Sequence, residues 1–171
     1  MSATFAADLQ PGAPDTGLRY VRGSRAQVPG PRGLPLMKPP YGRVVAIDLK
    51  SGDHVWMVAN AEGPRNHPDL KALNLPALGQ PIHDRLIATP TMLIAAQGDA
   101  NGEAATPAFG AEPTHTLRAY EKTSGRLLAE MELPAGAVGG MSTYQHDGRQ
   151  YLVLPIGTRG RPSELIALTA P

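Results

Sequence analysis

Hydrophobic positions recur with a two-residue period over residues 43–58, which is the spacing of β-strands. Residues 44–47 are apolar on both faces, so this strand is expected to be covered on both sides. Asp48 and Gly52 mark a tight reversal, because glycine readily takes the positive φ that such turns require. Residues 55–58 then carry the chain back, and the segment predicts a β-hairpin.

The same pattern returns over residues 117–128. In each segment an alanine stands two positions before an acidic residue, and a Ser-Gly pair follows: Ala46, Asp48 and Gly52 in the first, Ala119, Glu121 and Gly125 in the second. Two such hairpins, each followed by a Gly/Pro-rich connection, favour a repeated β unit. Two unrelated hairpins that share a common turn are the alternative.

Further short apolar segments predict more strands. Residues 86–88 and 92–96 form one pair, residues 141–146 and 149–155 form another around Asp147-Gly148, and residues 164–169 form a last strand. Residues 98–114 predict a long Gly/Ala/Pro-rich loop. With about eight strands in roughly two four-stranded units, the predicted class is all-β, and such units are typical of the blades of a β-propeller.

Proline content divides the chain into two parts. Seven prolines within residues 1–40 predict an extended Pro/Gly-rich arm, with only short pieces free to pair. Residues 41–171 are expected to hold the blades, as an incomplete domain, because two blades cannot close a ring.

Composition excludes several classes of function. The net charge of +1 gives no electrostatic basis for binding nucleic acid. The chain has no cysteine, so disulfide and thiolate chemistry are excluded within it. No apolar run approaches the roughly 20 residues of a membrane span, and the N-terminal residues lack the pattern of a signal peptide.

Three segments resemble the C-terminal part of the pyrroloquinoline-quinone-dependent dehydrogenases, especially the membrane glucose dehydrogenase type. They are GLPLMKPPYGRVVAIDLKSGDHVWMV (33–58), LRAYEKTSGRLLAEMELPAG (117–136) and STYQHDGRQYLVLPIG (142–157), followed by ELIAL. The alanine, acidic residue, Ser-Gly turn and Trp56 resemble the docking pattern that joins neighbouring blades in that family. Ala129 departs from it, since it stands where the second repeat would carry the tryptophan.

The resemblance implies a partial eight-bladed quinoprotein-type propeller, with the quinone and a calcium ion in the central channel of the full-length family. Gly157 and Thr158 stand where the family's glycine-rich strand end approaches the cofactor, so they are the expected cofactor-binding residues. The family's catalytic aspartate and calcium ligands lie upstream, and no residue of this chain matches them. No catalytic or metal-binding residue is therefore predicted here.

Other candidate chemistry has structural explanations. The five histidines, at positions 54, 67, 83, 115 and 146, lack the spacing of a metal site. Asp48 and Glu121 are expected to bind backbone groups at their turns rather than act as bases. Trp56 is expected to be a plug between blades, although stacking on a ligand is the alternative. Ser142 and Thr143 have no base at a recognisable spacing.

Two classes of function follow. The first is an oxidoreductase fragment: the last blades of a quinoprotein that oxidises a sugar or alcohol and passes electrons to a quinone acceptor, inactive without its remaining blades in the same or another chain. The resemblance also implies a periplasmic location. The second class is a non-catalytic propeller-type binding or scaffold module.

Overall fold

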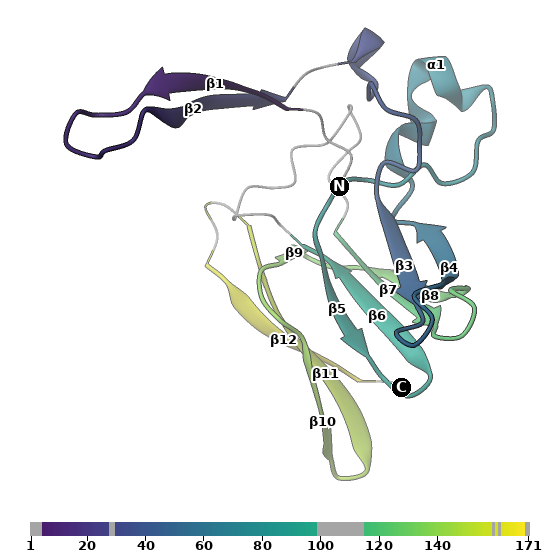
Figure 1. The fold of residues 1–171 in the computed structure, drawn as a ribbon. Helices are drawn as coiled ribbons and strands as arrows, with labels where there is room; N and C mark the ends of the chain where they lie inside the picture. The colour runs from purple at the N-terminus through teal and green to yellow at the C-terminus, as the bar shows by residue number, and fades with distance from the viewer. Residues whose placement is uncertain (1–4, 28–29, 99–114, 159, 161, 170–171) are drawn as a thin grey trace.

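The computed structural model describes residues 5–27, 30–98, 115–158, 160 and 162–169, and almost all of its regular structure is β-sheet (Figure 1). The expected loop at residues 98–114 lies, except for Gly98, outside the described residues. The strands are β1 (Phe5–Pro11), β2 (Tyr20–Gln27), β3 (Arg43–Ile47), β4 (His54–Ala59), β5 (Asp84–Ala88), β6 (Met92–Gln97), β7 (Thr116–Glu121), β8 (Leu127–Glu132), β9 (Gly136–Ala137), β10 (Ser142–His146), β11 (Arg149–Gly157) and β12 (Glu164–Thr169).

After the separate N-terminal hairpin β1–β2, three sheets follow one another along the chain. The first sheet is the antiparallel hairpin β3–β4, and the second is a four-stranded meander in the order β5-β6-β7-β8. In the third sheet β11 lies in the centre, with β12 on one edge and both β9 and β10 on the other. The second and third sheets correspond to the two four-stranded units that the sequence predicts.

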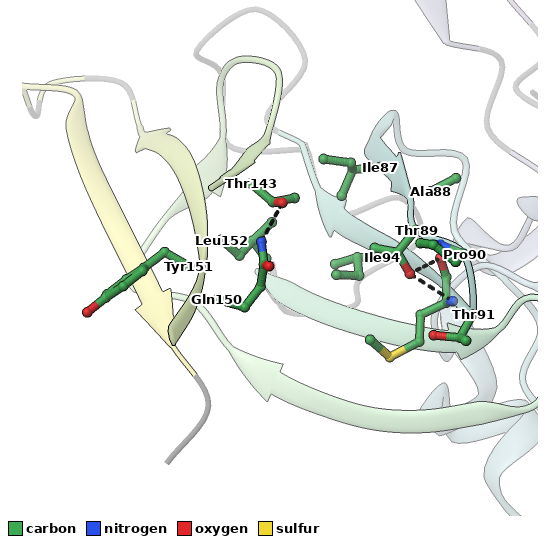
Figure 2. Close-up of a pocket in the computed structure, with 11 residues that line it drawn as sticks. Ile87, Ala88, Thr89, Pro90, Thr91, Ile94, Thr143, Gln150, Tyr151 and Leu152 are labelled. Atoms are coloured by element: carbon green, nitrogen blue, oxygen red, sulfur yellow. Dashed lines mark hydrogen bonds between the residues drawn. The ribbon is translucent and has the colours of Figure 1, made fainter. Parts of the chain in front are cut away.

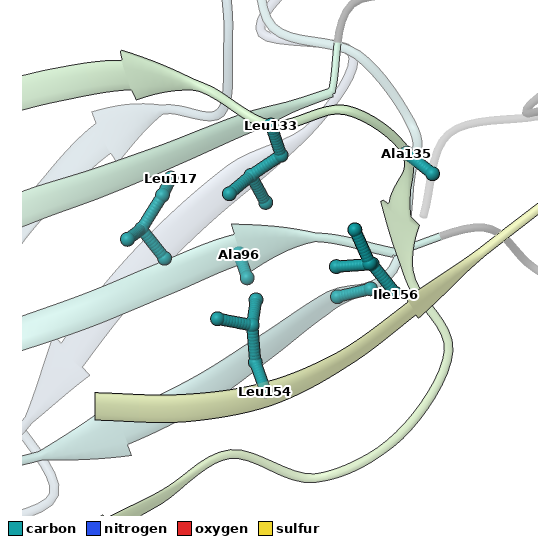
Figure 3. Close-up of a cluster of buried hydrophobic side chains, with 7 residues drawn as sticks. Ala96, Leu117, Leu133, Ala135, Leu154 and Ile156 are labelled. Carbon is teal, nitrogen blue, oxygen red and sulfur yellow. The ribbon is translucent and has the colours of Figure 1, made fainter. Parts of the chain in front are cut away.

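The hydrophobic core lies between the second and third sheets (Figure 3). Ala96 on β6 and Leu117 on β7 are paired across the ladder, so they point to the same face. They meet Leu154 and Ile156 of β11, which are 0% and 2% exposed. Four other buried or flanking residues extend the cluster: Leu133, Ala135, Ala137 and Leu152. β11 is therefore the central strand of the third sheet, and Leu154 and Ile156 bury it against the second sheet.

The two repeat hairpins have equivalent turns. The amide of Gly52 donates to the carbonyl of Asp48 at 2.7 Å, and the amide of Gly125 donates to the carbonyl of Glu121 at 2.8 Å. Both glycines have positive φ, 79° and 72°. Each hairpin also shows a shift in register immediately after its alanine, Ala46 or Ala119. The two hairpins lie in different sheets, as a propeller requires.

Trp56 joins the first sheet to the second. Its Nε1 donates to the backbone oxygen of Lys122 at 2.9 Å. A Cβ added to Gly125 would lie 2.6 Å from Cε3 of the indole, so the ring covers this glycine directly. The expected role of Trp56 as a plug between neighbouring sheets is confirmed by these two contacts, and ligand stacking is not needed to explain the residue.

The expectation that residues 44–47 are covered on both faces is wrong. Val44 is buried, but Ile47 is 50% exposed and Met57 on the paired strand is 47% exposed. The reason is that the first sheet has two strands among the described residues, and its contact with the second sheet covers one side.

The N-terminal arm is more regular than its prolines indicated. β1 and β2 pair as an antiparallel hairpin that projects from the three sheets (Figure 1). After the hairpin, Arg32 approaches the turn around the short helix α1 (Pro68–Lys71): its guanidinium lies 3.4 Å from the Asp69 carboxylate. His67 adds a contact, because its Nε2 lies 3.2 Å from the backbone oxygen of Arg32. The base of the arm is thus fixed to the segment that follows β4.

Candidate functional site

Gly157 and Thr158, the predicted cofactor-binding residues, lie where β11 ends. Gly157 pairs with Gly136 of β9 and is buried, and Thr158 is half-buried. Gly98, at the end of β6, forms a bridge with Ala137 of the same short strand. The ends of β6 and β11 therefore meet at β9, and each of the three segments has a buried glycine there: Gly98, Gly157 and Gly136.

Close packing within the chain requires these glycines. A Cβ on Gly157 would lie 2.9 Å from the Ser163 hydroxyl oxygen and 3.4 Å from a methyl group of Val138. A Cβ on Gly98 would lie 2.2 Å from the carbonyl oxygen of His83. Close packing within the chain therefore accounts for both Gly98 and Gly157.

Asp84 lies at the same end of the second sheet, at the start of β5. Asp84 is close to Gly98, because the amide of Gly98 donates to the carbonyl of His83, the residue before Asp84, at 2.9 Å. Burial raises the pKa of the Asp84 carboxyl to about 6, while a hydrogen bond from Asn60 and the charge of Arg118 act to lower it. The sequence analysis did not predict a buried carboxyl at this position. The signal that could have found it is an acidic residue directly before an apolar strand.

The raised pKa of Asp84 predicts a pH-dependent stability. The folded chain binds the proton more tightly than the unfolded chain, whose aspartate titrates near 3.8. The stability contributed by protonated Asp84 is therefore fully present below about pH 4 and is lost as the pH rises through about 6. The loss should amount to about 2–3 kcal/mol, from 1.36 kcal/mol per pKa unit.

Denaturant unfolding of the wild type and of Asp84→Asn between pH 4 and pH 7 would measure this effect. The asparagine variant keeps the size of the side chain but does not titrate. We expect the wild type to lose stability relative to the variant as the pH rises. Two parallel stability profiles would show that Asp84 titrates normally.

Asp48 binds backbone groups at its turn, as predicted: its Oδ1 accepts from the amide of Lys50 at 2.7 Å. Glu121 instead accepts from the Ser124 hydroxyl and from Arg126 at 3.3 Å. These two contacts lower the pKa of Glu121, so it is a poor proton acceptor. The turn carboxylates are structural in both repeats.

The described part of the chain contains no group of three His, Cys, Asp or Glu side chains that could hold a metal ion. His146 at the Asp147-Gly148 turn is 70% exposed, as expected of a turn histidine. Thr143 has Gln150 as its neighbour, whose Nε2 donates to the hydroxyl at 2.6 Å, and this amide cannot serve as a base. No helix within the described residues is both long and apolar enough to cross a bilayer.

A cleft of about 700 Å³ opens between the second and third sheets at the opposite end from Gly157 (Figure 2). Apolar side chains such as Ile87, Ile94 and Leu152 line it together with hydroxyl and amide groups. The hydroxyl of Thr89 accepts from the amide of Met92 at 2.9 Å and closes the β5–β6 turn at its rim. None of the eleven lining residues is charged.

Adjacent antiparallel sheets joined by a docked tryptophan define a partial β-propeller. Residues 5–152 match the PQQ family model, which describes the β-propeller domain of glucose/ethanol/alcohol dehydrogenases. The chain therefore belongs to the family of PQQ-dependent dehydrogenases, the quinoprotein oxidoreductases.

Relatives of established function support this assignment. Quinoprotein glucose dehydrogenase A of Acinetobacter calcoaceticus is 31% identical over 130 residues, which make up 76% of this chain and 15% of that protein. The quinoprotein glucose dehydrogenase of Escherichia coli (strain K12) is 31% identical over 136 residues, with the same shares. Methanol dehydrogenase [cytochrome c] subunit 1 of Paracoccus denitrificans is 41% identical over a shorter segment of 46 residues, which make up 27% of this chain and 7% of that protein. The chain thus spans about 15% of the length of the glucose dehydrogenases that it matches.

Proposed function

We propose that this chain supplies blades to a PQQ-dependent dehydrogenase that oxidises a sugar or alcohol and passes the electrons to a quinone acceptor. The docking of Trp56 onto the Lys122–Gly125 turn carries the proposal, because it joins neighbouring sheets at the repeat position that the family resemblance implies. The names of the relatives, which include glucose, quinate and glycerol dehydrogenases, support a hydroxyl-bearing substrate.

In this proposal Gly157 and Thr158 form part of the wall around the cofactor. Their position at the end of β11, where the glycine-rich strand end of the family approaches the cofactor, supports this part of the proposal. Bound pyrroloquinoline quinone would supply the redox chemistry, and calcium would be held by residues outside this chain. The chain's own part is to close one side of the pocket and to position the neighbouring blade. A periplasmic location belongs to the same proposal.

The isolated chain should be inactive as a dehydrogenase. The described residues lack both a metal-binding cluster and a carboxylate free to act as base beside Gly157, since Asp84 is largely buried against Asn60. The test is dye reduction with glucose and simple alcohols after addition of pyrroloquinoline quinone and calcium. We expect no turnover above that of the cofactor alone, and clear turnover would show that the chain carries its own catalytic groups.

A scaffold module without chemistry is the second candidate. It is favoured by the absence of charged groups in the cleft and by the structural roles of the turn carboxylates. Dehydrogenase activity that appears only when the remaining blades are added separates the two candidates.

A further inference from the structure

The face of the second sheet that is turned away from the hydrophobic core is polar. The pairing register places Asp84 opposite Gln97, and Arg118 opposite both Ala95 and Glu130. These residues alternate with Ala96 and Leu117, which point into the core, so they lie on the other face. This face is turned toward the first sheet, because Asn60, directly after β4, hydrogen-bonds to Asp84. We call this contact the polar seam: Asn60, Asp84, Gln97, Thr116, Arg118 and Glu130.

Four of the six residues of the polar seam are buried, whereas Asp84 is half-buried and the Glu130 side chain is 44% exposed. Gln97 is 1% exposed, Asn60 4%, Arg118 5% and Thr116 7%. Some of its polar atoms are paired: Nε of Arg118 donates to the Glu130 carboxylate, and Oε1 of Gln97 accepts from the amide of Thr116 at 3.1 Å. These bonds orient the side chains but do not use all their hydrogen-bonding groups.

Five buried side-chain atoms of the polar seam have no partner among the described residues. Two are donors, Nε2 of Gln97 and Nη1 of Arg118, two are acceptors, Oδ1 of Asp84 and Oδ1 of Asn60, and the hydroxyl of Thr116 can be either. Buried polar atoms are almost always hydrogen-bonded in folded proteins, because leaving them unpaired is costly. Five unpaired atoms at one contact between sheets therefore indicate a bound molecule that both donates and accepts hydrogen bonds.

The mixed charges of the polar seam exclude an ion as the bound molecule. An anion attracted by Arg118 would meet the carboxyl groups of Asp84 and Glu130, and a cation attracted by those carboxyl groups would meet the guanidinium. A neutral molecule with donors and acceptors suits all of these groups. Water is the smallest such molecule, and buried waters commonly make about three hydrogen bonds to polar groups of this kind.

We propose that the polar seam is a hydration site, in which at least one ordered water molecule bridges Asp84 Oδ1 to Gln97 Nε2 and the Arg118 guanidinium. The water links side chains that hold the first and second sheets together, since Asp84 is also bonded to Asn60. The joint between these sheets thus has two parts: Trp56 on the turn side and the hydrated polar seam on the Gly157 side.

Oxygen-17 magnetic relaxation dispersion of the whole chain counts buried waters with long residence times. We expect at least one such water in the wild type and its loss in Asp84→Leu, which removes the acceptor and fills its space. Gln97→Glu is a second variant, because it keeps the acceptor for Thr116 but replaces the donating amide with oxygen. Glu164→Leu is the matched control, since it removes an exposed carboxylate from β12 of the third sheet, and it should keep the water.

A crystal structure of the unmodified chain at high resolution gives an independent result if a variant fails to fold. The proposal expects a solvent peak within hydrogen-bond distance of Asp84 Oδ1 and Gln97 Nε2. It would be overturned by density for another side chain in that position, by direct pairing of the five atoms with one another, or by relaxation data without a long-lived water.

Discussion

Replacing Trp56 with alanine should lower the free energy of unfolding by about 3 kcal/mol, the lower end of the range for large buried aromatic side chains, because the indole is half-buried. The substitution removes the hydrogen bond to Lys122 and uncovers Gly125, so the first sheet loses its contact with the β7–β8 turn. Such a loss is a large share of the stability of a small domain. Equilibrium denaturation of the two proteins measures it.

Trp56→Phe is the matched control for that experiment. Phenylalanine keeps an aromatic ring over Gly125 but has no indole N–H for the Lys122 carbonyl. Its cost should be smaller, about 1 kcal/mol for the lost hydrogen bond plus any imperfect packing. Equal stability of the wild type and the alanine variant would mean that the indole does not join the sheets.

Replacing Gly125 with alanine should cost about 3 kcal/mol, and the repeat offers a control at Gly52. Both glycines have positive φ, which costs an alanine roughly 1–2 kcal/mol. A Cβ at Gly125 would also lie 2.6 Å from the Trp56 ring, whereas nothing lies within 4 Å of a Cβ at Gly52. The excess cost at Gly125 therefore isolates the contact between the sheets.

Combining Gly125→Ala with Trp56→Ala extends the comparison. Once the indole is absent, the alanine at position 125 should cost no more than the alanine at position 52. The free energies of unfolding of the single and double variants provide this double-mutant cycle. An identical cost for Gly52→Ala and Gly125→Ala in the presence of Trp56 would contradict the docking.

The local features of the fold could be predicted from the sequence. Both repeat hairpins, the Asp147-Gly148 hairpin and the last strand depend on short-range patterns, so their positions followed from alternation and turn residues. The role of Trp56 followed from the repeat together with the family resemblance. The β1–β2 hairpin was missed because its prolines and polar residues obscure the alternation.

The polar seam and the cleft could not be predicted, because each joins residues that are far apart in the sequence. Burial raises the pKa of Asp84, while Asn60 and Arg118, which act to lower it, come close to the carboxyl only through the packing of the sheets and the strand register. The exposure of Ile47 likewise depends on which strands cover the first sheet. A pattern along the chain gives the faces of a strand but does not show what lies opposite them.

Complementation tests the central claim, that this chain provides blades to a quinoprotein dehydrogenase. The partner is quinoprotein glucose dehydrogenase A of Acinetobacter calcoaceticus, truncated to remove the C-terminal region that this chain would replace. Each part should be inactive alone, and the mixture with pyrroloquinoline quinone and calcium should reduce the dye in the presence of glucose. The Trp56→Ala variant should reduce less dye because its first sheet is poorly joined to the second. A complex of the two parts that forms but shows no cofactor-dependent dye reduction would contradict the enzymatic role and favour the scaffold.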